Sequence, residues 1–232
     1  MNIGSRLEAI GALVPQGSIL ADIGTDHAYL PVWLLQQGRI LRAIAGDIAE
    51  GPCLAAGNTV SMYGMKDRVE VRLGSGLKVL QNGEVNCIAI AGMGASTMID
   101  ILTEDLPLAQ EAETLILQPM AGAPSLRAWL VAHGWSLQAE ELVEEGRHLY
   151  EIIVAVRGQA KSYTRAEMEI GPLLIAKQHP LLKQQFTKVL TGYKKLLQNM
   201  SKSEQAVASA KYADYAQLVQ EVEELANDTY HK

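Results

Sequence analysis

The sequence predicts an α/β fold, in which a mostly parallel sheet ends in an antiparallel hairpin and is followed by a C-terminal helical coiled-coil hairpin. Short apolar runs alternate with helical stretches through the first 157 residues, a pattern typical of βαβ units. Two further strand-like runs, 135–143 and 149–156, are separated by only five residues, too few for a parallel crossover. Beyond residue 158 only helical patterns remain. We therefore expect one domain over residues 1–158 and a helical appendage over 159–232.

The individual elements follow from apolar runs and their punctuation. Glycine or aspartate ends several of the apolar runs, as at Gly24, Asp47 and Gly92, which is typical of strands that lead into helices. Expected strands are 18–23, 41–46, 69–73, 85–91 and 114–118, and expected helices are 27–37, 51–63, 98–102 and 124–133.

The appendage shows two apolar seams at spacings of three and four, from Leu182 to Met200 and from Ala208 to Leu225. Ser201 and Glu204 have the spacing of a capping box between the seams. Two amphipathic helices joined by so short a connection should fold back on each other. Whether they pair within one chain or between chains, as monomer or homodimer, is open.

Composition excludes several classes of protein. An apolar content of 48% and a charged content of 20% exclude a disordered chain. The uncharged stretches are too short and too polar to cross a bilayer, and the N-terminus has no secretion signal. Cys53 and Cys87 make neither a disulfide framework nor a metal-spaced cluster. We expect a cytoplasmic protein that uses no membrane and no metal.

Charge is distributed unevenly along the chain, whose formal net charge is −6. Residues 1–160 carry 10 basic and 18 acidic groups, and residues 161–211 carry 9 basic and 3 acidic groups. The overall balance argues against a nucleic-acid partner, whereas the basic segment favours one. The simpler interpretation of its lysines is that they solvate a helical surface.

The turn after the first expected strand is the most informative motif. Asp22, Ile23 and Gly24 place a tight turn before a helix, the position at which α/β sheets bind nucleotides. Asp26 stands where a dinucleotide fingerprint needs glycine, and its carboxylate would repel a pyrophosphate. NAD and FAD are therefore disfavoured, and a cationic ligand such as S-adenosylmethionine is favoured.

Three further loops complete a candidate cofactor site. Asp47 ends the second expected strand, where one carboxylate can accept both hydroxyls of a ribose, although it could equally cap the next helix. The Gly74-Ser75-Gly76 turn lies where such folds contact adenine, and small residues around Gly92 allow close approach of a ligand. Ordinary turns and close packing are the competing explanations.

With the run from Asp22 to Pro31, the Ala91-Gly92-Met93-Gly94 loop and Gln118-Pro119 in view, the chain resembles the TrmK family of bacterial tRNA (adenine-22-N1)-methyltransferases. The resemblance extends from Arg6 through the helical hairpin and implies a Rossmann-like class I methyltransferase domain with a tRNA-binding appendage. It implies S-adenosyl-L-methionine as cofactor and tRNA as partner. One departure is Ala95, where the family has glycine, and whose methyl group could narrow the acceptor site.

The resemblance and the motifs together nominate three sets of residues. Asp26 or His27 could accept a hydrogen bond or proton from the adenine, and Tyr29 could stack beside it; capping by Asp26, burial of His27 and core packing of Tyr29 are the structural alternatives. The cofactor set is Arg6, Asp22, Gly24, Thr25, Asp26, His27, Asp47, Ile48, Gly74, Ser75, Gly76, Ala91, Gly92 and Met93. The RNA set is Arg127, Arg147, Lys183, Lys188, Lys194, Lys195 and Lys202.

Two other functions remain open at this stage. A class I methyltransferase acting on another RNA or on a small molecule would share every cofactor residue. A non-catalytic nucleotide-binding module could use the same fold, with the coiled coil as a dimerisation device, but that interpretation leaves Asp26 without a purpose.

Overall fold

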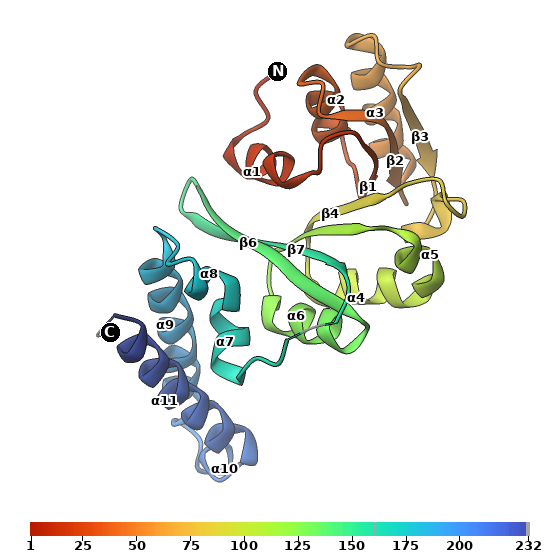
Figure 1. Ribbon diagram of the computed structural model, residues 1–232. Coiled ribbons are helices and arrows are strands. Elements are labelled where there is room, and N and C mark those ends of the chain that lie inside the picture. The colour runs from red at the N-terminus through yellow and green to blue at the C-terminus, as the bar shows by residue number, and fades with distance from the viewer. Residues whose placement is uncertain (160, 231–232) are drawn as a thin grey trace. The chain divides into compact units, whose positions relative to one another are not determined.

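The computed structural model describes residues 1–159 and 161–230. The chain divides into two compact units, unit 1 from residue 1 to 160 and unit 2 from residue 161 to 232. Unit 1 is built on a seven-stranded sheet of order β3-β2-β1-β4-β5-β7-β6 (Figure 1). The strands are β1 (Ser18–Ile23), β2 (Ile40–Asp47), β3 (Val69–Leu73), β4 (Cys87–Met93), β5 (Thr114–Pro119), β6 (Trp135–Glu145) and β7 (His148–Arg157).

The first five strands are parallel, and β7 is antiparallel to both β5 and β6. The connection between β6 and β7 is too short for a crossover, so the two strands pair as the expected hairpin. Only Ile153–Val156 of β7 pair with β5, whereas the β6–β7 pairing continues to Glu145 and His148. The hairpin therefore extends beyond the sheet.

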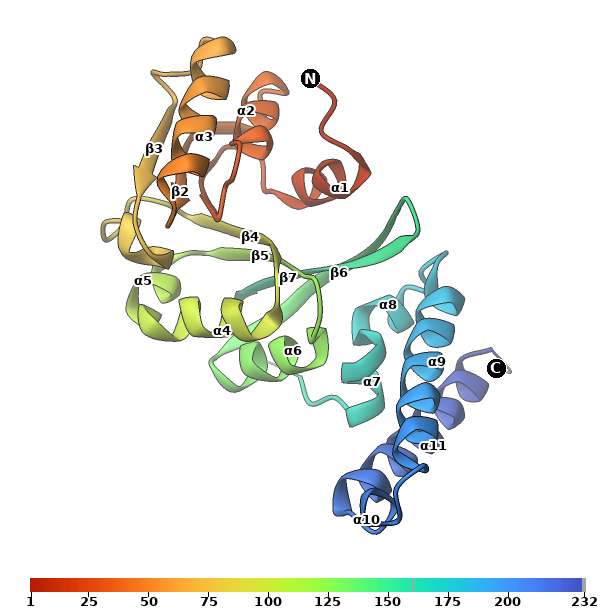
Figure 2. The ribbon, with the colours of Figure 1, turned by 180° about the vertical axis from the view of Figure 1, so that it is seen from behind.

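Helices cover both faces of the sheet, as Figures 1 and 2 show. Helices α1 (Ser5–Leu13), α2 (Tyr29–Gln36) and α3 (Glu50–Met62) lie on one face. The other face carries α4 (Ala95–Glu104), α5 (Leu106–Glu111) and α6 (Ala123–Ala132), and a 3₁₀ turn, η1 (Gly76–Val79), packs against α4. Because both faces are covered, every side chain of β5 is buried.

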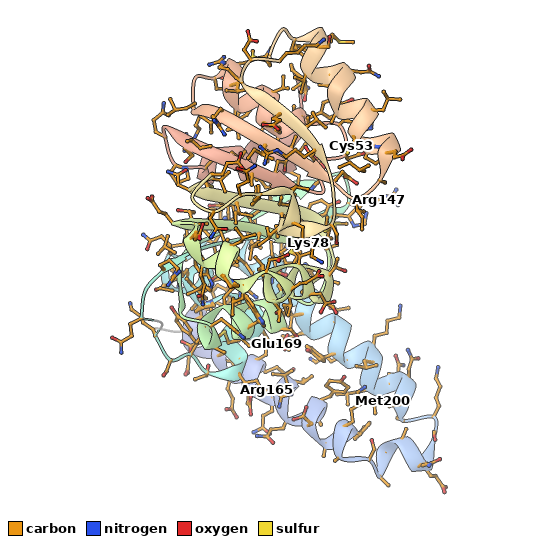
Figure 3. The ribbon with its side chains drawn as sticks, turned by 90° about the vertical axis from the view of Figure 1, so that its right-hand side faces the viewer. Cys53, Lys78, Arg147, Arg165, Glu169 and Met200 are labelled. Atoms are coloured by element: carbon orange, nitrogen blue, oxygen red, sulfur yellow. The ribbon has the colours of Figure 1, made fainter. Side chains whose placement is uncertain are left out.

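Unit 2 contains α7 (Arg165–Ile170), α8 (Pro172–Ala176), α9 (Leu182–Met200), α10 (Glu204–Val207) and α11 (Ala210–Tyr230). The two long helices, α9 and α11, pack against each other and against α7. Arg165 at the start of α7 donates to both carboxylate oxygens of Asp214 at 2.6 Å, and Tyr193 donates to Glu169 at 3.0 Å; Figure 3 labels Arg165 and Glu169.

The expected capping box at Ser201 is wrong. Helix α9 continues to Met200, which leaves Ser201 in helical backbone as its C-cap, and the Ser201 hydroxyl donates back to the Gln198 carbonyl at 2.9 Å. The short helix α10 is capped by Ser203, whose hydroxyl accepts from the Ala206 amide.

Candidate active site

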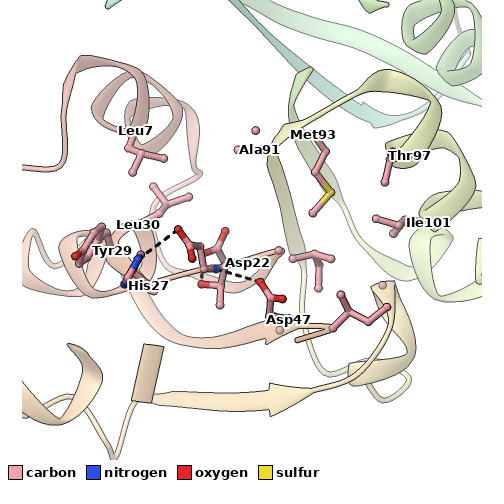
Figure 4. A pocket seen from close by; sticks show the side chains of 18 of the residues that line it. Leu7, Asp22, His27, Tyr29, Leu30, Asp47, Ala91, Met93, Thr97 and Ile101 are labelled. Atoms are coloured by element: carbon pink, nitrogen blue, oxygen red, sulfur yellow. Dashed lines mark hydrogen bonds and ion pairs between the residues drawn. The ribbon is translucent and has the colours of Figure 1, made fainter. Parts of the chain in front are cut away.

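A cavity of about 560 Å³ lies in unit 1 at the carboxyl ends of the strands, where the strand order reverses between β1 and β4 (Figure 4). Every nominated cofactor residue and all three nominated catalytic residues line it. Four loops, at the ends of β1, β2, β3 and β4, and the first turn of α1 supply these residues. Motifs far apart in the sequence therefore converge on one site.

The β1 turn forms the floor of the cavity. The amides of Gly24 and Thr25 both donate to the Gly46 carbonyl of β2, at 2.8 and 3.1 Å. The Thr25 hydroxyl donates to Oδ2 of Asp22 at 2.6 Å, and Asp22 is 6% exposed. Burial, helped by the charge of Asp47 and opposed by the Thr25 bond, raises the pKa of Asp22 to about 6.

Glycine suits position 24 for two reasons. Its φ of +74° lies in the region that glycine adopts at no steric cost. A Cβ at this position would also overlap the terminal methyl group of Met93, whose side chain points across the cavity. The glycine therefore creates the room beside the acidic floor.

Asp47 holds two loops together instead of capping α3. Its Oδ2 accepts the Asp26 amide at 3.2 Å, and its Oδ1 accepts the Ala49 amide at 3.0 Å. The N-cap of α3 is Ala49, without a side-chain bond, so the helix-cap interpretation is wrong. Each carboxylate oxygen retains accepting capacity toward the cavity.

Asp26, His27 and Tyr29 form a row along the cavity edge. Nε2 of His27 lies 3.6 Å from Oδ2 of Asp26, and the rings of His27 and Tyr29 stack with centroids 5.1 Å apart. Asp26 has a φ of 54°, as does Ala28 beside it, so the row lies on strained backbone.

The structural alternatives for this row are contradicted. The N-cap of α2 is Ala28 and no side chain caps the helix, so Asp26 is not a cap. The side chain of His27 is 44% exposed, which excludes a buried histidine, and Tyr29 is 41% exposed and is not part of the core. All three side chains are available to a ligand.

Arg6 lies in the first turn of α1. Its Nη1 donates to Oε1 of Gln118 at 2.7 Å, its Nε lies 4.0 Å from Glu145, and its guanidinium covers the ring of Tyr150. Among the described residues that line the cavity, Arg6 is the only arginine or lysine.

Several lining residues were not nominated. Leu7 of α1, Leu30 of α2, and Thr97 and Ile101 of α4 belong to the wall without any motif. Thr97 could have been inferred, because the first turn of a helix that follows a glycine loop faces the same site. Ala95 does not narrow the cavity, since it is not among the lining residues and an added Cβ on Gly122 would meet its methyl group at 3.1 Å.

The nomination of Arg127 as an RNA contact is wrong. Its side chain is fully buried, with Nε 2.5 Å from Glu140 and Nη2 2.8 Å from Glu151. Burial opposes its charge, but the two carboxylates together raise the pKa of the guanidinium. Arg127 therefore has no surface to offer to a phosphate.

The other nominated RNA residues are exposed. Arg147 lies in the turn of the β6–β7 hairpin, where Figure 3 labels it. In unit 2, Lys194 pairs with Glu223 at 2.6 Å, and Lys202, in the turn after α9, donates to Asn199 at 3.1 Å. Lys183, Lys188 and Lys195 lie on α9.

Two other kinds of site were searched for in the described part of the chain. Residues 1–159 and 161–230 contain no group of three or more His, Cys, Asp or Glu side chains that could hold a metal ion. Within these same ranges no helix has the length and apolar character needed to cross a membrane.

The sheet order, the antiparallel seventh strand and the acidic cavity define a class I S-adenosylmethionine-dependent methyltransferase. The family model described as TrmK, tRNA (adenine(22)-N(1))-methyltransferase, matches residues 20–226, and the chain belongs to this family. A Bacillus subtilis protein named tRNA (adenine(22)-N(1))-methyltransferase is 32% identical over 98% of this chain and 94% of its own length.

Solved structures agree. Streptococcus pneumoniae Sp1610, in complex with S-adenosyl-L-methionine, is 36% identical with a TM-score of 0.84, covering 95% of this chain and 99% of that one. M. capricolum TrmK, in complex with S-adenosyl-homocysteine, is 25% identical with a TM-score of 0.82, covering 96% and 97%. The expected fold class, family, cofactor and enzymatic activity are thereby confirmed.

Proposed function

We propose that the cavity of unit 1 binds S-adenosylmethionine, and that Asp26 and His27 receive the adenine whose N1 is methylated. The observation that carries the proposal is the convergence of three aspartates and a single arginine on one cavity. S-adenosylmethionine carries a sulfonium, an ammonium and a carboxylate, so this set of charges complements it. When bound, the cofactor supplies an electrophilic methyl group.

Each wall of the cavity has a distinct binding role in this proposal. Asp47 accepts the two ribose hydroxyls, while Ile48 and the Gly74-Ser75-Gly76 turn border the adenine of the cofactor. Asp22 faces the ammonium group, and Arg6 faces the carboxylate. Gly24, Thr25 and the Ala91-Gly92-Met93 loop line the space between these charges.

Catalysis rests on positioning and electrostatics. Adenine N1 carries an in-plane lone pair, so no covalent enzyme intermediate is required. Asp26 and His27 accept hydrogen bonds from the exocyclic amine, and Asp26 stabilises the positive charge that develops on the ring. Tyr29, stacked on His27, offers an exposed ring face beside the base.

The decisive experiment is nucleoside analysis of tRNA incubated with the protein and S-adenosylmethionine. We expect 1-methyladenosine, and only at position 22. Absence of methylated nucleoside from every tRNA tested would refute the proposal, and methylation at another position or atom would redirect it to a different substrate.

The roles of Asp26 and His27 are tested by single-turnover kinetics with tRNA saturating. We expect Asp26→Asn and His27→Ala to slow methyl transfer by at least about ten-fold. This is a modest effect beside those typical of general acid–base catalysis. Asp67→Asn, which changes an exposed residue outside the cavity, is the matched control. Rates close to that of the unmodified enzyme would remove Asp26 and His27 from the chemistry.

We further propose that unit 2 is the tRNA-binding appendage and that the enzyme acts in the cytoplasm, where tRNA is found. The exposed lysines of α9 support the first point, since phosphates are held mainly by Lys and Arg. We expect a triple variant to bind tRNA more weakly, with a smaller dependence of the affinity on salt concentration and with unchanged cofactor affinity; its substitutions are Lys188→Glu, Lys194→Glu and Lys195→Glu. Lys66→Glu, on unit 1 outside the cavity, is the control.

A further inference from the structure

Gln118 is a buried polar side chain that the proposed chemistry does not use. It is the fifth residue of β5, it pairs in register with Ala91 of β4, and it is fully buried. It does not line the cavity. Burying an amide is costly unless the amide is hydrogen-bonded, so its partners indicate what it does.

The amide is held in one orientation. Its Nε2 donates to the Pro119 carbonyl at 3.1 Å and lies 3.7 Å from the sulfur of Met120. Its Oε1 therefore faces Arg6, whose Nη1 donates to it at 2.7 Å. The reversed amide would place a donor against a guanidinium, which has no acceptor.

The partner of this amide lies at the ligand site. Nη1 of Arg6 is 3.8 Å from the position that a Cβ on Gly92 would occupy, beside the end of β4. Gln118 orients the guanidinium without neutralising it, because the amide carries no net charge. The carboxylate of Glu145 is only a weak counter-charge for Arg6, because its Oε2 lies 4.0 Å from Nε of Arg6 and its side chain is 38% exposed. The positive charge of Arg6 thus remains available to an anion in the cavity.

We infer that Gln118 is a positioning residue for cofactor binding, which fixes Arg6 so that its guanidinium meets the carboxylate of the methionine part. This inference rests on the proposed function. The other charged groups that line the cavity in the described chain are Asp22, Asp26, Asp47 and, when protonated, His27. A ligand carboxylate that lies near three aspartates needs a cation whose charge is not already neutralised by a carboxylate of the protein.

The test compares two ligands that differ only in the amino-acid part. Calorimetry would measure affinities for S-adenosylhomocysteine, which has the carboxylate, and for 5′-methylthioadenosine, which lacks it. We expect Gln118→Met to weaken S-adenosylhomocysteine binding about ten-fold and to change 5′-methylthioadenosine binding less than two-fold, roughly the loss of one charged hydrogen bond.

Further variants separate positioning from folding. Arg6→Met should show the same selectivity, and the double variant should bind S-adenosylhomocysteine no more weakly than Arg6→Met alone, because Gln118 acts through Arg6. Gln118→Glu keeps the size of the side chain and its accepting oxygen, but its negative charge would neutralise Arg6. It should therefore also weaken the binding of S-adenosylhomocysteine and leave that of 5′-methylthioadenosine unchanged. Gln138→Met, an exposed glutamine of β6, is the control.

The outcomes are distinguishable. Equal weakening of both ligands by Gln118→Met, or no weakening of either, would overturn the positioning role. Unaltered ligand binding in Arg6→Met would overturn it too. Failure of the unmodified protein to bind S-adenosylhomocysteine would instead refute the proposed function itself.

Discussion

Two regions of unit 1 bury charge in opposite ways. Beneath the β6–β7 hairpin, Arg127 lies between Glu140 and Glu151 and forms an ion pair with each of them. At the cavity, Asp22 is buried, and within residues 1–159 and 161–230 its carboxylate accepts a side-chain hydrogen bond only from the Thr25 hydroxyl, while Arg6 is held by a neutral amide. The first region neutralises its charges internally, whereas the second keeps charges of both signs for a ligand. A buried charge indicates a binding site only when its partners leave it uncompensated.

The largest expected effect is at the compensated cluster. Arg127→Met removes the guanidinium that forms ion pairs with the buried Glu140 and with Glu151, and should lower the free energy of unfolding by about 3–5 kcal/mol. Urea denaturation would measure it, with the exposed Arg68→Met as control. Adding Glu140→Gln should recover part of the loss. A loss of less than about 1 kcal/mol in the free energy of unfolding would mean that Arg127 and the two glutamates do not neutralise one another in the interior.

Removing the uncompensated acid should have the opposite sign. The pKa of Asp22 is about 6 in the folded chain against an ordinary value of 3.8, so the native state binds the extra proton and stability falls as pH rises from about 4 to 6. Without cofactor, Asp22→Asn should therefore be more stable above pH 6, by up to about 3 kcal/mol. The gain should come with weaker cofactor binding.

Urea denaturation at several pH values would check this second prediction. The two curves should converge below pH 4 and separate through pH 6, while Asp67→Asn should follow the unmodified protein at every pH. Parallel curves for Asp22→Asn and the unmodified protein would show that Asp22 is not destabilised by its burial, and the contrast between the two regions would fail.

The smallest stability effect should be at Arg6. Arg6→Met removes a partly exposed cation but leaves the Gln118 carbonyl oxygen buried without a donor, which costs about 1–2 kcal/mol. The double variant Arg6→Met, Gln118→Met removes both polar groups and should be more stable than Arg6→Met alone. Chemical denaturation of the three variants measures this, and a double variant that is less stable than either single one would contradict it.

Local motifs explain why so much of the site was predictable. The Asp22–Gly24 turn and Asp47 lie at strand ends, and the parallel βα topology brings the carboxyl ends of the parallel strands to one edge of the sheet. The hairpin was predictable from loop length alone. These features need only short-range sequence and one rule of topology.

Features that depend on distant partners were not predictable. Arg127 was interpreted by its residue type, although Ala123 and Leu130 place it on the buried face of α6, and its carboxylate partners come from β6 and β7. The misplaced cap has a different origin, because two serines lie close together: Ser201 is the C-cap of α9, and Ser203 supplies the hydroxyl that caps α10.

The hairpin that extends beyond the sheet also sets the order in which the enzyme becomes complete. The Ser5 hydroxyl donates to the Glu144 carbonyl, and the Arg6 amide donates to Glu145, so the first helical turn is secured by residues almost 140 positions later. Contacts of such sequence separation form late, since a long loop must close first. During synthesis the β1 turn leaves the ribosome early, but Arg6 has its full support only after the hairpin has emerged. We therefore expect the proposed cofactor site to be complete only when the whole of unit 1 has been synthesised.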